Sequence, residues 1–283
     1  EVEFTLDPVT DSSFHLYAFS NRIGGKVEQW NDKGPGSNHA RAVGSDGPSL
    51  GNEAVLFSDS NYLMVDNDPL INLTAPAVFF VGRFSDKASS DEGDENSTLV
   101  SWAGYSGLSR GWRIYGNPSD YFLNLDAFTS GAANFGSNFN SAYFIDDNFI
   151  GTFYLDSSGG TNLWRTFING ELEVESEIPS NSQISYNGGS NRSAIGAYLM
   201  SNSSNPDGHF NGTIRELIVM NSLDEVQVSK IEGYLAHKWN FAEELPYSHP
   251  FKLYAPMRDP KFLNSFTHSS IDATQSIKLS NNG

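Results

Sequence analysis

The amino-acid sequence predicts an all-β fold, a sandwich or barrel built from short strands. Turn-forming residues are abundant, with 26 Gly and 12 Pro among 283 residues. Aromatic residues make up 13% of the chain, too many large apolar side chains for a disordered protein. Short apolar runs alternate with clusters of Gly, Ser, Asn and Asp that read as loops, as is typical of sandwiches and barrels.

The strongest predicted strand covers residues 78–84, where an unbroken apolar run indicates burial on both faces. Asn169 and Gly170 predict a hairpin with a type I′ turn, because both residue types tolerate the positive φ angles that this turn requires. The other predicted strands are residues 99–102, 112–115, 121–125, 149–155, 163–168, 194–197 and 214–220.

One helix is predicted near the end of the chain. Ser222 and Glu225 have the spacing of a capping box at its start. Gly233 lowers the helix propensity by roughly 1 kcal/mol relative to Ala, which a close approach to the sheet would explain. The apolar stripe of the helix is Val228, Ile231, Leu235 and Trp239.

The charge balance excludes several classes of function. The formal net charge is −17, so binding to nucleic acid is not expected, and an anionic polysaccharide would need a concentrated Arg/Lys cleft or a bridging cation. The absence of Cys excludes disulfides and thiolate chemistry, and no apolar run reaches the length of a membrane span. The start at Glu1 fits a removed signal peptide or an excised domain.

Three consecutive motifs carry a family resemblance: Gly196-Ala197, residues 210–219 (FNGTIRELIV) and residues 231–239 (IEGYLAHKW). Together they resemble the end of a bacterial concanavalin A-like lectin/glucanase domain of the laminin-G-like superfamily. This resemblance implies a jelly-roll sandwich of two antiparallel sheets with one short C-terminal helix. It also implies an extracellular location, secreted or on the bacterial cell surface. We expect residues 1–250 to form this domain and residues 251–283 to be an extension that packs on it or leads to a linker.

Two pairs of neighbouring aromatic and basic residues are candidates for glycan binding. Sugar rings stack on aromatic faces, and arginine binds hydroxyl or carboxylate groups through paired donors. Trp112 and Ile114 should lie on one face of their strand, with Arg113 and Tyr115 on the other. The candidate binding residues are Trp112, Arg113, Tyr115, Trp164 and Arg165. The alternative is that both tryptophans lie in the core and the arginines pair with nearby acids.

Enzyme chemistry is the second class of function to consider. A polysaccharide lyase could use Arg113 to neutralise a uronate and Tyr115 or His209 to move the proton. The less favoured reading is a glycoside hydrolase, because the carboxylates of residues 171, 173 and 175 alternate along one strand. Three glutamates exposed on the outer face of a strand are the simpler interpretation of that pattern.

Calcium is the one cofactor that the sequence suggests, in a structural role, and no organic cofactor is expected. Acid clusters offer the oxygen ligands that Ca²⁺ prefers, and Asp59, Asp66 and Asp68 form one such cluster. The cluster matches no established calcium motif, so a solvated loop is the alternative reading.

The first reading of function is a non-catalytic glycan-binding or adhesive domain that recognises a polysaccharide on a concave sheet. The alternatives are a secreted polysaccharide-degrading enzyme, with a lyase favoured over a hydrolase, and a structural spacer. The sequence indicates no membrane insertion and does not indicate an oligomeric state.

Overall fold

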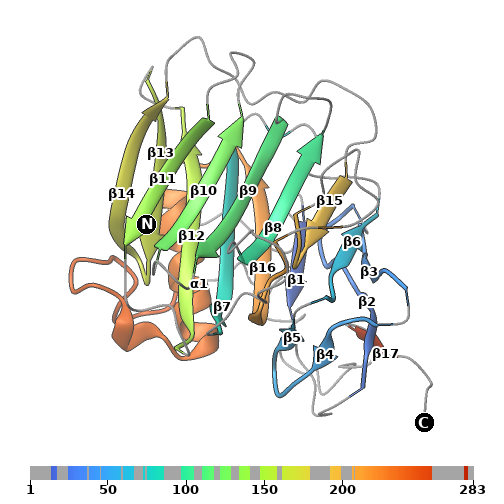
Figure 1. Cartoon of the computed structure of the whole chain (residues 1–283). Helices are drawn as coiled ribbons and strands as arrows, with labels where there is room; N and C mark the ends of the chain where they lie inside the picture. The colour runs from blue at the N-terminus through green and yellow to red at the C-terminus, as the bar shows by residue number, and fades with distance from the viewer. Residues whose placement is uncertain are drawn as a thin grey trace.

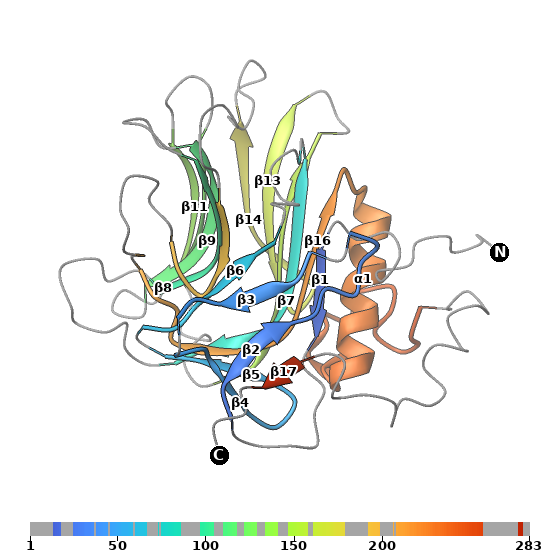
Figure 2. The same cartoon turned by 90° about the vertical axis from the view of Figure 1, so that its right-hand side faces the viewer.

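The computed structural model describes residues 14–17, 25–36, 38–44, 46–58, 60–66, 73, 75–85, 97–104, 110–117, 122–128, 134–140, 147–157, 161–178, 192–198, 206, 208–256 and 277–279. Within these residues the fold has three layers, two antiparallel β-sheets and one α-helix, as Figures 1 and 2 show.

The first sheet, called sheet A, is the central layer and contains eight of the described strands. Its strand order is β14-β13-β12-β7-β16-β5-β4, and β1 also pairs with β16. Its strands are β1 (Phe14–Tyr17), β4 (Ser49–Leu50), β5 (Val55–Phe57), β7 (Pro76–Phe84), β12 (Phe149–Asp156), β13 (Asn162–Ile168), β14 (Glu171–Ile178) and β16 (Gly212–Asn221).

The second sheet, called sheet B, contains nine of the described strands in the order β11-β10-β9-β8-β15-β6-β3-β2-β17. Its last strand, β17, comes from the end of the chain and pairs with β2 at the sheet edge. Its strands are β2 (Val27–Trp30), β3 (Ala40–Ala42), β6 (Leu63–Val65), β8 (Ser97–Gly104), β9 (Arg110–Asn117), β10 (Phe122–Phe128), β11 (Asn134–Asn140), β15 (Arg192–Ile195) and β17 (Ile277–Leu279).

The central strands of sheet A, such as β7 and β12, are buried on both faces. One face packs on sheet B around side chains such as Phe80, Phe153 and Trp102, which form the core between the sheets. The other face packs on the helix α1 (Glu225–Trp239), and Figure 2 shows the helix on the side of β16 and β7 opposite to sheet B. The short 3₁₀ helix η2 (Ala242–Glu244) follows α1.

The predicted strand at residues 78–84 is confirmed as part of β7. Its alternate side chains enter the two cores: Phe80 lies between the sheets, and Phe79 lies beneath α1. The type I′ hairpin is also confirmed, because Asn169 and Gly170 have φ angles of 49° and 77° between β13 and β14. The strands β4 and β11 were not among the strands predicted, since neither has a continuous apolar run.

The helix begins two residues later than its sequence suggested. Asp224, not Ser222, is the N-cap. Its carboxylate accepts a 2.8 Å hydrogen bond from the backbone N–H of Gln227, and the side-chain Oε1 of Gln227 accepts one from the backbone N–H of Asp224. Ser222 instead has a φ of 57° in the turn before the helix. The predicted apolar stripe is confirmed, since all four of its residues are buried.

The glycine in the helix faces the segment that follows α1, not the sheet. A Cβ atom at Gly233 would lie 2.5 Å from Cβ of Phe251. The same segment is tied to the helix by a 2.8 Å hydrogen bond between His237 Nε2 and the Phe251 carbonyl and by a 3.4 Å contact between His249 and Glu232. Gly233 therefore does allow a close approach, as predicted, but to the segment around Phe251 and not to the sheet.

No helix in the described part of the chain is both long and apolar enough to cross a membrane.

Candidate functional site

The outer face of sheet B is the one large sheet face that no described helix covers (Figure 2). Along β9 the side chains alternate as predicted: Trp112 and Ile114 enter the core between the sheets, and Arg113 and Tyr115 lie on the outer face. The candidate site is therefore built from the second pair of these residues.

Arg113 lies between two tyrosine rings. Its guanidinium carbon is 4.2 Å from the centroid of the Tyr115 ring and 4.6 Å from that of Tyr198. Both distances are within the range of cation–π attraction, which fixes the direction of the guanidinium group. Tyr115 is only 7% exposed, while Arg113 and Tyr198 are half-buried. A ligand on this face would therefore meet Arg113 and Tyr198, with Tyr115 as their support.

The third residue of this cluster, Tyr198, is positioned by a contact between neighbouring strands. Ser101 on β8 pairs directly with Arg113 on β9, so both side chains lie on the outer face. The buried Ser101 hydroxyl donates a 2.8 Å hydrogen bond to the carbonyl of Ala197, the residue before Tyr198. This bond holds the segment that follows β15 beside Arg113. Tyr198 was missed in the sequence because it lies 83 residues from Tyr115 in a turn-rich segment.

A second arginine lies in the same cross-strand row of sheet B. The row runs from Arg113 through Ser101, Ala194 and Met64 to Arg41 on β3. Arg41 is ion-paired, since its Nε atom is 2.6 Å from Asp66 Oδ2. It is separated from Arg113 by four strand spacings, roughly 19 Å, so the two arginines belong to different parts of the face.

The two tryptophans predicted as stacking platforms lie in the core instead. Trp112 is 1% exposed and Trp164 is 2% exposed, both in the core between the sheets. Neither indole ring offers a face to a sugar. Their indole N–H groups are buried without a hydrogen-bond partner in the described part of the chain, which adds to the cost of placing them there.

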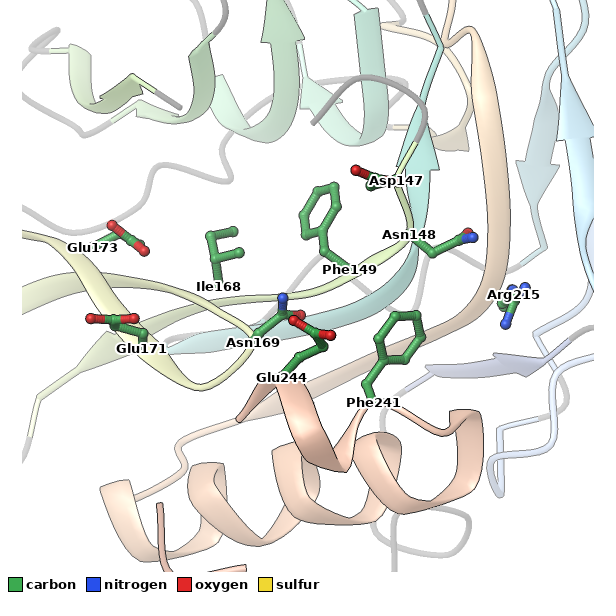
Figure 3. A pocket seen from close by; sticks show the side chains of 10 residues that line it. All are labelled: Asp147, Asn148, Phe149, Ile168, Asn169, Glu171, Glu173, Arg215, Phe241 and Glu244. Atoms are coloured by element: carbon green, nitrogen blue, oxygen red, sulfur yellow. The ribbon is translucent and has the colours of Figure 1, made fainter. Parts of the chain in front are cut away.

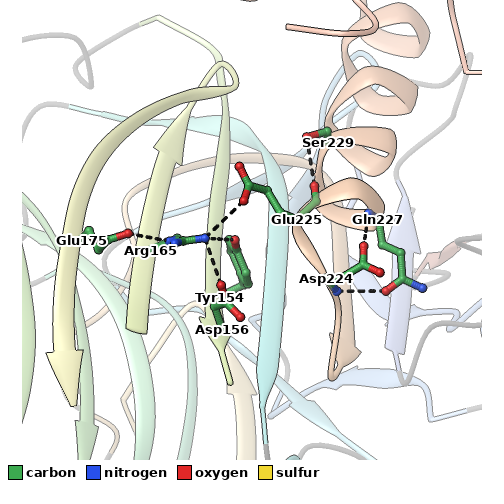
Figure 4. A network of polar contacts seen from close by, with 8 residues as sticks. All are labelled: Tyr154, Asp156, Arg165, Glu175, Asp224, Glu225, Gln227 and Ser229. Carbon is green, nitrogen blue, oxygen red and sulfur yellow. Dashed lines mark hydrogen bonds and ion pairs between the residues drawn. The ribbon is translucent and has the colours of Figure 1, made fainter. Parts of the chain in front are cut away.

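The predicted binding residue Arg165 belongs to an ion-pair network between sheet A and the helix (Figure 4). Its guanidinium lies 2.7 Å from Glu175, 3.0 Å from Asp156 and 3.5 Å from Glu225, at the start of α1. It also donates a 3.0 Å hydrogen bond to the hydroxyl of Tyr154. With its donors used in this way, Arg165 links the helix to the sheet and is not placed to hold a glycan.

The same network changes the protonation of its members. Burial alone would lower the pKa of Arg165, but its hydrogen bonds with Tyr154 and Glu175 outweigh burial and raise the pKa. Burial also raises the pKa of Tyr154, against the opposing effect of the Arg165 guanidinium. Tyr154 is therefore a neutral hydrogen-bond acceptor at neutral pH and not a general base.

The three candidate lyase residues are only partly brought together. Arg113 and Tyr115 are in contact, as described above. His209 forms a parallel backbone bridge with Thr98. Thr98 lies on β8 and pairs with Tyr115 on the neighbouring strand β9. Its ring lies against Tyr62, with 6.0 Å between ring centroids. The histidine is therefore two strands away from Tyr115, with Thr98 between them.

Only one of the three predicted calcium ligands, Asp66, lies among the described residues. Asp66 is paired with Arg41, and Asp59 and Asp68 lie outside the part of the chain that the structure describes. Among the residues described, no three His, Asp or Glu side chains are grouped so that they could hold a metal ion. The calcium site stays a prediction.

The fold defines the class of protein as a two-sheet antiparallel β-sandwich of the jelly-roll type. No protein-family model matches the sequence, and no curated protein matches it. Solved structures do match. The CBM40 domain of the Ruminococcus gnavus IT-sialidase, bound to α2,3-sialyllactose, has a TM-score of 0.51 and 16% sequence identity, over 62% of this chain and 94% of that one.

A toxin domain has the same fold. The binding domain of botulinum neurotoxin serotype G has a TM-score of 0.52 and 15% identity over 82% of this chain, but the match spans about half of the toxin chain, 51%. At these identities the two likenesses show the fold alone.

Proposed function

We propose that this domain is a glycan-binding module and that the outer face of sheet B is its binding surface. The observation that carries this proposal is the position of Arg113 between Tyr115 and Tyr198 on the outer face of sheet B. A guanidinium held by two rings loses little freedom on binding, and its planar donors suit a carboxylate or a pair of hydroxyls. The half-buried ring of Tyr198 adds an apolar surface for a sugar ring.

The electrostatics favour a ligand with one acidic sugar over a polyanion. A net charge of −17 repels an extended anionic polysaccharide, and the arginine nearest to Arg113 in its cross-strand row, Arg41, is already paired with Asp66. A single carboxylate bound by Arg113 gains the charge-assisted hydrogen bonds with little of this repulsion. The sialyllactose bound by the similar CBM40 domain is a ligand of this kind and supports the proposal.

We also propose an extracellular location and membership of the concanavalin A-like superfamily. Both rest on the resemblance of the C-terminal motifs, which form β16 and α1 in this structure. The observed sandwich agrees with that superfamily assignment.

A polysaccharide lyase is the alternative use of the same face. The specific observation in its favour is the contact between Arg113 and Tyr115, which would place a cation beside a potential proton carrier. Tyr115 is largely buried beneath the guanidinium, however, and His209 lies on the far side of Thr98. The site is therefore better suited to holding a sugar than to moving its protons.

The test is calorimetric titration of the protein with 3′-sialyllactose and with lactose. We expect measurable binding of the acidic trisaccharide and at least tenfold weaker binding of lactose. Equal affinities, or no binding of either sugar, would contradict the acidic-sugar proposal. Incubation with uronate-containing polysaccharides completes the test, because the appearance of unsaturated products would establish the lyase alternative.

A further inference from the structure

The chain bends after β15 and brings Tyr198 to Arg113. Strand β15 ends at Ile195, and the two residues that follow, Gly196 and Ala197, form a bend. The next residue is Tyr198, whose ring centroid is 4.6 Å from the guanidinium carbon of Arg113. Tyr198 therefore lies beyond the end of β15, and its place beside the arginine depends on how this bend is held.

The first half of the bend is fixed by Gly196. Its φ angle is 88°, a left-handed conformation that favours glycine. A Cβ atom at this position would lie 2.5 Å from Cδ1 of Phe57, a side chain of the core between the sheets. The Gly196 amide donates a 2.9 Å hydrogen bond to the Leu99 carbonyl, and the Gly196 carbonyl accepts one of 2.9 Å from the Phe210 amide. These contacts set the direction in which the chain leaves β15.

The second half of the bend is held by the side chain of Ser101. Its hydroxyl donates a 2.8 Å hydrogen bond to the Ala197 carbonyl, and both residues are fully buried. Ser101 is also the direct cross-strand partner of Arg113. One side chain thus lies beside the arginine and holds the bend that carries the tyrosine. Because Ser101 is fully buried and its proton is used in this bond, it is not placed to contact a ligand.

We propose that Ser101 is a positioning residue of the glycan-binding site, which acts through the Ala197 carbonyl to hold Tyr198 against Arg113. This inference rests on the proposed function of the outer face of sheet B. Without the hydroxyl, the buried Ala197 carbonyl loses this hydrogen bond and the bend gains alternative conformations. A sugar must then order the tyrosine and the arginine as it binds, which costs affinity although no group that touches the sugar has been removed.

The pocket of about 580 Å³ beside the end of α1 is not a second site for the same ligand (Figure 3). Four acidic side chains line it, and Arg215 is the one cation among its lining residues. The acidic side chains are exposed, and they would repel the carboxylate of an acidic sugar. Titration with such a sugar therefore reports on the outer face of sheet B. The four acidic residues are Asp147, Glu171, Glu173 and Glu244.

The first experiment is calorimetric titration of the whole chain and its variants with 3′-sialyllactose. Ser101→Ala should weaken binding roughly 3- to 10-fold, the cost of ordering a side chain on binding. Ser101→Thr keeps the hydroxyl and should restore the affinity to within about twofold of wild type. The matched control is Thr98→Val, since Thr98 is buried on the same strand and its hydroxyl has no hydrogen-bond partner in the described part of the chain. This variant should also bind within about twofold of wild type.

A double-mutant cycle shows whether Ser101 acts through Tyr198. When Tyr198→Ala is already present, Ser101→Ala should cause no further loss of affinity, because the group that it positions is gone. Equal losses with and without Tyr198 would overturn the proposal, as would full affinity in Ser101→Ala alone. Thermal unfolding of each variant shows that it is folded.

A measurement without ligand separates this inference from the proposed function. Protein labelled with 3-fluorotyrosine gives a fluorine NMR resonance for Tyr198, identified as the one that Tyr198→Phe removes. This resonance should shift or broaden in Ser101→Ala and stay in place in Thr98→Val. An unchanged resonance in Ser101→Ala would overturn the positioning role even where sialyllactose binds. A changed resonance in a chain that binds no sugar would contradict the proposed function and leave the positioning of Tyr198 supported.

Discussion

Lys238 and Glu216 form an ion pair across the boundary between the helix and sheet A. The Nζ atom of Lys238, on α1, is 2.8 Å from Oε2 of Glu216, on β16, and the Glu216 side chain is fully buried. The same carboxylate accepts hydrogen bonds from the indole N–H of Trp239 and, at 3.3 Å, from the hydroxyl of Tyr234. A buried charge satisfied in this way fixes the helix at one position on the sheet.

Removing the lysine should therefore destabilise the fold strongly. Lys238→Met leaves the Glu216 carboxylate buried without its counter-ion, and we expect a loss of about 3 kcal/mol in the free energy of unfolding. The matched control is Lys26→Met, which removes a surface pair with Asp46 and should cost less than about 1 kcal/mol. Urea unfolding measures both, and similar losses in the two variants would contradict the role given to Glu216.

Replacing the glycine in the helix by alanine should destabilise the fold, although helix propensity alone predicts a gain in stability. Gly233→Ala should gain about 1 kcal/mol from propensity, but its Cβ atom would lie 2.5 Å from Cβ of Phe251. We expect a net destabilisation of about 1–2 kcal/mol, because the segment after α1 must shift. Ser229→Ala, at a half-buried position on the same helix, should change stability by only a few tenths of a kcal/mol. A more stable Gly233→Ala variant in thermal unfolding would show that Phe251 moves freely.

The placement of Trp164 in the core separates stability from binding. Trp164→Phe should lower the free energy of unfolding by about 2 kcal/mol, since it leaves a cavity in the core between the sheets. The affinity of the folded variant for a glycan should stay within twofold of wild type. A large loss of affinity without a loss of stability would show that Trp164 contacts the glycan and would contradict its placement in the core.

The raised pKa of Glu173 predicts a pH-dependent stability effect. Burial, followed by the charge of Glu171, raises this pKa above its ordinary value of 4.5, so the folded state binds the proton more tightly than the unfolded chain does. The associated stability is present below the unfolded pKa and is lost as pH rises through the folded pKa.

Glu173→Gln should therefore melt at a higher temperature than wild type at neutral pH. The difference should vanish at about pH 3, where both forms of the chain have a protonated carboxyl group. Thermal unfolding as a function of pH measures this, with Glu177→Gln, another exposed glutamate of β14, as the control. A variant that is less stable than wild type at neutral pH would contradict the unfavourable environment assigned to Glu173.

Much of the fold could be predicted from the sequence because its signals are local. The apolar run of β7, the Asn169-Gly170 turn and the helical stripe each depend on residues that are neighbours along the chain. The helix start was misplaced because Ser222 and Asp224 are both good N-caps and only the backbone angles decide between them.

The site was harder to predict because it depends on which face of sheet B packs on sheet A. The alternation along β9 placed Trp112 and Arg113 on opposite faces of the strand. It did not indicate which of the two faces packs on sheet A. Arg165 was misassigned because Asp156 and Glu225, its partners, are brought to it by two different elements.

The most direct test of the binding proposal compares two arginines in the same row of sheet B. Arg113→Gln should weaken binding of 3′-sialyllactose roughly 10- to 100-fold, the loss expected when hydrogen bonds to a charged group are removed. Arg41→Gln, which removes an exposed arginine about 19 Å away, should leave the dissociation constant within twofold. If both variants bind as wild type does, or if both lose affinity equally, the cluster of Arg113, Tyr115 and Tyr198 is not the glycan-binding site.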